Sequence, residues 1–159
     1  MQRKSVIVAA KRTPIGSFQG QFSSIVASEL GSCVVKDLLN DTQVLPEDVE
    51  EIILGNVLSA GQGQAPARQV TIKSGCPNTV ESLTINKMCG SGLKAVMLAD
   101  QIIRCGDANI IIAGGMESMT NAPYILKDAR SGQRLGHGEL IDSMIHDGLW
   151  DAYNNLHMG

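Results

Sequence analysis

The sequence predicts an α/β fold in which helices cover both faces of a mainly parallel, mixed sheet. Short apolar runs rich in β-branched residues alternate with segments whose apolar residues recur at helical spacing, as in successive β-α-β units. Glycine and proline lie between these segments, where turns are expected. A chain of 159 residues is long enough to bury a hydrophobic core.

The chain opens with a predicted strand and a predicted helix. Residues 5–10, SVIVAA, are apolar and β-branched, and we expect a strand buried on both faces. After a break at Thr13-Pro14, Ser23 or Ser24 is expected to cap a helix that reaches about Leu39.

Two further strands and one helix follow. Pro46 is expected to begin a single turn, and residues 51–58, EIILGNVL, to form a strand. A helix is predicted over 66–74, because proline opens it and Gly75 closes it. Residues 82–87 alternate between apolar and polar, which predicts the next strand.

The last helix and strand of this part flank a glycine-rich turn. The sequence Cys89-Gly90-Ser91-Gly92 leads into a helix that extends to about Cys105, with Gly106 as its stop. Residues 108–113, ANIIIA, are expected to form the most apolar strand. Residues 93–103 are apolar around most of the helix, so we expect other polypeptide to enclose it on several sides.

The alternation stops near Glu117, and we place a boundary between residues 1–116 and 117–159. The second part is rich in glycine and charge, and its single amphipathic candidate is residues 140–145. So long an irregular stretch is typical of a functional covering loop or a small additional domain.

Composition excludes several kinds of protein. A net charge of −3 and five aromatic residues do not favour binding to nucleic acid or to an anionic membrane. Cysteine and histidine spacings suggest neither a disulfide framework nor a metal site. The apolar run 6–10 is too short for a signal peptide, so we expect a cytoplasmic protein. The segment Gly61-Gln62-Gly63 lacks the residues of a phosphate loop and is interpreted as a turn.

Cys89 is the candidate nucleophile. A turn from strand to helix leaves backbone N–H groups unpaired at the helix N-terminus, and this end of the helix dipole favours a thiolate. The flanking glycines let a substrate approach, and the N–H groups are suited to hold an oxyanion.

The alternative is a buried, inert cysteine, which is common among free cysteines. We expect Cys33 to pack on the apolar face of its helix, and Cys76 and Cys105 to be structural.

Several motifs resemble those of the thiolase family. The most specific is NKMCGSGLKAV at residues 86–96, followed by ANIIIAGGMESMTNAPY from residue 108. The stretches VIVAAKRTPIGSFQG, LGNVLSAGQGQAPARQ and GLWDAYNNLHMG also agree, so the resemblance covers the whole chain in order. The residues around the cysteine are similar to those of the short-chain branch of the family, whose members are acetyl-CoA acetyltransferases.

This resemblance implies a reaction, a fold and a set of site residues. Cys89 would take an acetyl group from acetyl-CoA as a thioester, and its own N–H would help to hold the thioester oxygen. A second acetyl-CoA would then attack to give acetoacetyl-CoA, with thiolysis as the reverse reaction. Coenzyme A thioester is the implied substrate, and neither a tightly bound cofactor nor a metal is implied.

The resemblance also assigns the second part of the chain. Residues 117–159 would begin the loop domain that covers coenzyme A, with Leu149, His157 and Met158 along the pantetheine and acyl end. Residues 127–138 would join dimers into tetramers, so a homodimer or homotetramer is implied for the full-length form.

The sequence departs from the family in its length. Thiolases have two similar halves, and the second supplies a histidine in a Gly-His-Pro segment and a second cysteine, which are not found here. Our first hypothesis is therefore an N-terminal portion of an acetyl-CoA acetyltransferase, inactive alone. The second hypothesis is a non-catalytic module that binds coenzyme A or another subunit. A ketoacyl synthase is a more distant alternative.

Overall fold

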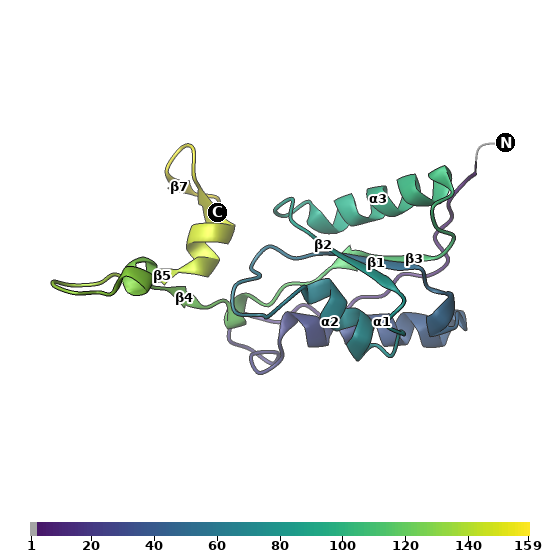
Figure 1. The fold of residues 1–159 in the computed structure, drawn as a ribbon, viewed down its shortest axis with the longest axis horizontal. Coiled ribbons are helices and arrows are strands. Elements are labelled where there is room, and N and C mark those ends of the chain that lie inside the picture. Colours follow the sequence, from purple (N-terminus) through teal and green to yellow (C-terminus); the bar gives the residue numbers. More distant parts are fainter. Residues whose placement is uncertain (1–2) are drawn as a thin grey trace.

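The computed structural model describes residues 3–159, which divide into a layered α/β part and an extended part (Figure 1). The sheet has the strands β1 (Glu51–Gly55), β2 (Glu81–Ile85) and β3 (Ile111–Gly115), in the order β2-β1-β3. Both pairings are parallel, with Glu51 opposite Glu81 on one side and Ile111 on the other. The helices are α1 (Ala27–Thr42), α2 (Pro66–Lys73) and α3 (Ser91–Cys105).

The helices cover both faces of the sheet, which confirms the predicted fold class. Figure 1 shows α1 and α2 on one face and α3 on the other. The central strand β1 is the most enclosed, and Ile52 and Ile53 are fully buried. Val35 of α1 and Val70 of α2 belong to the same core cluster as Ile52, so this face holds the larger part of the core.

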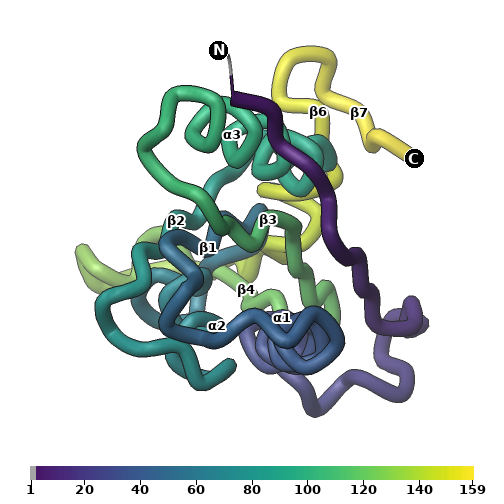
Figure 2. The backbone as a smooth tube through the Cα atoms, turned by 90° about the vertical axis from the view of Figure 1, so that its right-hand side faces the viewer, coloured from purple at the N-terminus to yellow at the C-terminus, as the bar shows by residue number. Residues whose placement is uncertain are grey.

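The prediction of a buried strand over residues 5–10 is wrong. These residues are extended but form no strand, and Ile7 is 80% exposed. Ser5 Oγ donates to Asp100 of α3 at 2.5 Å, and Lys11 forms ion pairs with α1 through Asp37 at 3.0 Å and through Asp41. The segment therefore crosses from α3 to α1 beside β3, as the purple tube in Figure 2 shows.

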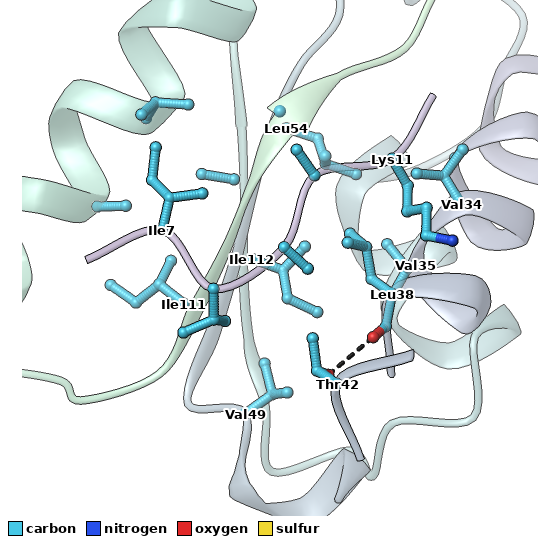
Figure 3. A pocket seen from close by; sticks show the side chains of 18 of the residues that line it. Ile7, Lys11, Val34, Val35, Leu38, Thr42, Val49, Leu54, Ile111 and Ile112 are labelled. Carbon is cyan, nitrogen blue, oxygen red and sulfur yellow. Dashed lines mark hydrogen bonds between the residues drawn. The ribbon is translucent and has the colours of Figure 1, made fainter. Parts of the chain in front are cut away.

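An apolar cavity of about 660 Å³ lies between this segment and β3. Residues 5–13 form one wall, and α1, α3 and β3 form the others; Ile7, Ile111 and Ile112 line it in Figure 3. No backbone hydrogen bond joins residues 5–13 to β3 in the part of the chain described. The segment is apolar enough for a strand, but it lacks a neighbour close enough to pair with it.

Two other expectations about the first helix are also wrong. Helix α1 begins at Ala27 and its N-cap residue is Val26, with no side-chain cap, so neither Ser23 nor Ser24 caps it. The reason is a pair of turns before the helix, in which Ser23 N–H donates to the Gly20 carbonyl at 3.0 Å. Cys33 is exposed and is not part of the packed face.

Side-chain hydrogen bonds move the ends of two strands. β1 ends at Gly55: Asn56 N–H still donates to the Ile85 carbonyl of β2 at 3.0 Å, but the next two N–H groups, of Val57 and Leu58, donate to the Glu117 carboxylate instead of to a strand. β3 begins at Ile111, because the N–H groups of Asn109 and Ile110 donate to the Glu50 carboxylate. Those two backbone bonds, Asn109 first, hold the pKa of Glu50 below its ordinary value.

Residues 117–159 form short elements that extend away from the sheet (Figure 1). The expected amphipathic segment 140–145 is not a single helix, because Ile141–Asp142 pairs as a strand and a π-helical turn then starts at Met144. The pairs are β4 (Tyr124–Ile125) with β5 (Ile141–Asp142), and β6 (Trp150–Asp151) with β7 (Leu156–His157). The short helices of this part are η2 (Met119–Asn121), η3 (Lys127–Ser131) and the π-helix η4 (Met144–Leu149), whereas η1 (Pro46–Asp48) precedes β1.

No helix within residues 3–159 combines the length and the apolar character needed to cross a bilayer.

Candidate active site

Cys89 lies in the turn that joins β2 to α3, and its side chain is exposed. Gly90 is the N-cap residue of α3, so the thiol stands at the helix start. The carboxyl ends of the parallel strands lie at the same end of the molecule as this turn (Figure 1). Loops at that edge of an open α/β sheet commonly carry ligand sites.

Two side chains shape this turn. Asn86 Oδ1 accepts a hydrogen bond from Met88 N–H at 2.9 Å. Ser91 Oγ accepts from Lys87 N–H at 2.8 Å and donates to the Met88 carbonyl at 2.6 Å. Met88 has a φ of +50°, in the left-handed region that a methionine rarely adopts. The turn is therefore held in an unusual backbone conformation by the residues around it.

Neither Asn86 nor Ser91 was among the predicted site residues. Both carried a signal, because asparagine and serine side chains often bond to backbone groups two to four residues away. The sequence-based prediction of a site rests instead on the cysteine and the glycines of the same stretch.

The backbone N–H of Cys89 donates to no acceptor within residues 3–159. Unpaired N–H groups at a helix start carry partial positive charge. An N–H group in this position is able to donate to a negatively charged oxygen on a substrate bound at the thiol.

The other predicted site residues lie in and beside the β6–β7 hairpin: Leu149 ends η4, His157 belongs to β7 and Met158 follows it. Met158 N–H donates to the Leu149 carbonyl at 2.8 Å, and His157 pairs with Trp150 across the hairpin. Leu149 is half-buried, whereas His157 and Met158 are exposed. Figure 1 shows this hairpin at the same end of the molecule as the start of α3.

The hairpin and the Cys89 turn are separate in the part of the chain described. No hydrogen bond joins them there, and no histidine side chain bonds to Cys89. His146, for example, pairs with Asp147 at 2.8 Å. Within residues 3–159, the candidate nucleophile Cys89 therefore has an N–H donor of its own and no base in contact with its thiol.

Comparison with known proteins gives a consistent result. The model of the thiolase N-terminal domain matches residues 5–159. The chain is 58% identical to an acetyl-CoA acetyltransferase of Pseudomonas aeruginosa over 97% of its own length and 39% of that relative's. It is 57% identical to a probable acetyl-CoA acetyltransferase of Escherichia coli, again over 97% of the chain and 39% of the relative.

A third relative shows the same coverage. An acetyl-CoA acetyltransferase of Allochromatium vinosum is 56% identical over 100% of this chain and 40% of its own length. The chain thus spans about two fifths of the length of the curated relatives it matches. With a domain match over nearly every residue, the chain belongs to the thiolase family and corresponds to the thiolase N-terminal domain.

Proposed function

We propose that this chain carries the nucleophile of a cytoplasmic acetyl-CoA C-acetyltransferase, which condenses two acetyl-CoA into acetoacetyl-CoA and catalyses the reverse thiolysis. The observation that carries the proposal is the exposed Cys89 at the start of α3, whose own N–H has no acceptor within residues 3–159. The names of the relatives support the substrate class.

In the first stage the Cys89 thiolate attacks the carbonyl carbon of acetyl-CoA. A carbon–sulfur bond forms, and the Cys89 N–H donates to the resulting oxyanion. The bond to the coenzyme A sulfur then breaks, and coenzyme A leaves as the thiol after taking up a proton. The product of this stage is acetylated Cys89.

In the second stage another acetyl-CoA loses a proton from its methyl group to a base. The carbanion attacks the acetyl-Cys89 carbonyl, and the bond between that carbon and the cysteine sulfur breaks. This gives acetoacetyl-CoA and the free thiolate. The histidine and the second cysteine of the family's other half would together activate Cys89 and carry out the proton transfer at carbon, so the chain alone is expected to acylate slowly and to turn over poorly.

The rest of the assignment follows the same proposal. Residues 117–159 begin the covering domain, in which Leu149, His157 and Met158 line the pantetheine and acyl end of the substrate. The full-length form assembles as a homodimer or homotetramer, and residues 127–138 join the dimers.

A chimeric enzyme tests this proposal directly. Residues 1–159 are joined to the part of the Pseudomonas aeruginosa relative that lies beyond the matched region, and acetoacetyl-CoA formation is measured. We expect activity that Cys89→Ser abolishes, with acetyl found on the Cys89 peptide by mass spectrometry. Full activity in the Cys89→Ser chimera would refute the assignment, and Cys105→Ser is the matched control.

One observation favours a second function, a non-catalytic module that binds coenzyme A or another subunit. The outer face of α3 exposes apolar side chains, with Leu93 70% and Met97 49% exposed. Such a module, purified alone, should be folded and should either bind acetyl-CoA or form one defined oligomer. Aggregation together with strong binding of a hydrophobic dye would contradict this function.

A further inference from the structure

The start of α3 sits directly on the end of β1, at a point where no side chain fits. A Cβ atom added to Gly55 would lie 2.8 Å from the Ser91 carbonyl carbon and 2.9 Å from the Gly92 nitrogen, and it would collide with Ser91 Cβ. Two of these three atoms are backbone atoms of α3, which cannot rotate away. The missing side chain at Gly55 therefore sets how closely the helix approaches the sheet.

Ser91 occupies this contact and reaches from it into the Cys89 turn. Its side chain is buried, with 4% of the residue exposed. Its hydroxyl bonds to the N–H of Lys87 and to the carbonyl of Met88, so it ties together the two residues that precede Cys89. A backbone hydrogen bond spans the same turn, because Ser91 N–H also donates to the Met88 carbonyl at 3.0 Å.

The consequence for Cys89 follows from the order of residues. Cys89 stands between Met88, whose φ is +50°, and the N-cap Gly90. The direction of its thiol and of its N–H is thus determined by a turn whose conformation depends on the Ser91 hydroxyl.

We propose that Ser91, seated in the space left by Gly55, is a positioning residue that keeps the Cys89 thiol and N–H aligned with the start of α3. Its importance for catalysis rests on the proposed function, whereas its effect on the thiol does not. Without the hydroxyl, the backbone of Met88 relaxes and Cys89 moves away from the positive end of the helix.

The test measures the charge preference of Cys89 in the 159-residue chain. Iodoacetate is an anion and iodoacetamide is neutral, so the ratio of their alkylation rates reports the local field. Cys105, which is exposed at the other end of the same helix, is the internal reference. In the unsubstituted chain we expect the iodoacetate-to-iodoacetamide ratio to be higher at Cys89 than at Cys105.

Ser91→Ala removes the hydroxyl and keeps the Cβ atom. We expect it to lower the ratio at Cys89 by about two- to fivefold, the range that a helix dipole gives for a nearby anion, and to leave Cys105 unchanged. Ser74→Ala is the matched control, because this buried serine also bonds to a backbone carbonyl but lies at the end of α2. It should leave both ratios unchanged.

The outcomes separate clearly. An unchanged Cys89 ratio in Ser91→Ala, or an equal change at Cys89 and Cys105, overturns the proposal. If Ser91→Ala does not fold, the measurement moves to the chimera, where the same substitution should lower kcat more than it raises KM. An active Cys89→Ser chimera would remove the proposed function but would leave the alkylation result to judge Ser91.

Discussion

The Glu117 carboxylate is expected to contribute strongly to stability, because it connects the end of β3 to the chain that leaves β1. Oε1 accepts from Asn56 Nδ2 at 2.8 Å and from Leu58 N–H at 3.0 Å, and Oε2 accepts from Val57 N–H at 2.9 Å. Asn56 also donates to the Met116 carbonyl at 3.3 Å. Removal of the carboxylate therefore leaves two backbone donors, those of Val57 and Leu58, without a partner.

The size of the effect follows from those two donors. An unsatisfied buried donor costs about 1–3 kcal/mol, and Val57 is only half-buried, so we expect Glu117→Ala to lower the free energy of unfolding by about 3 kcal/mol. Glu117→Gln keeps one acceptor oxygen and turns an amide N–H₂ toward Val57. Its cost is expected to be about 1–2 kcal/mol, because one donor is stranded instead of two.

Urea unfolding followed by circular dichroism measures both variants. The control is Glu139→Gln, the same substitution at an exposed glutamate. If Glu117→Ala costs less than about 0.5 kcal/mol, as a surface substitution does, these hydrogen bonds do not hold the loop and the reasoning is wrong.

Three further predictions concern other parts of the chain. Burial, and then the charge of the facing Glu81, raise the pKa of the Glu51 carboxyl in the folded chain. The protonated carboxyl therefore favours folding at pH values below its ordinary pKa of 4.5, and this contribution is lost as the pH rises through the pKa of the folded state. Glu51→Gln should therefore stabilise the chain at neutral pH by about 0.5 kcal/mol after solvent screening, with no gain at pH 4. Hydrogen bonds from the Asn154 side chain and then from the turn backbone lower the pKa of Asp151, so its support for the β6–β7 hairpin is present above 3.8 and lost as pH falls through the folded value. Hydrogen exchange should show the hairpin opening under acid, and at all pH values in Asp151→Asn. Gly106 ends α3 with a φ of +90°, so Gly106→Ala should cost about 1–2 kcal/mol in thermal unfolding, and an unchanged midpoint would contradict the left-handed cap.

Proline and glycine at the ends of segments predicted the helices better than the apolar patterns predicted the strands. The helix predicted over 66–74 is α2, and the helix after the cysteine ends at Cys105 with Gly106 as its cap. Proline and glycine restrict or free the backbone at their own positions, so the sequence alone contains the information that fixes these helix ends. The apolar run 5–10 lacks that advantage, because a strand also needs a neighbour and the sequence does not say which one.

The candidate site likewise has features that neighbouring residues predict and features that only the folded structure shows. The position of Cys89 between a strand and a helix follows from residues next to it in the chain. The contact between Gly55 and Ser91 joins two distant segments, and it emerges only when β1 and α3 are packed together. The roles of Leu149, His157 and Met158 rest on the family resemblance and stay predictions.

The cavity beside β3 has a consequence for handling the protein. In the part of the chain that the structure describes, one edge of β3 has backbone N–H and C=O groups without strand partners, and Val6 and Val8 on the segment opposite are more than three-quarters exposed. Open strand edges beside exposed valines act as templates for pairing with other chains. The chain should therefore self-associate as its concentration rises, so dilution, more than temperature, should decide how long a sample stays monodisperse.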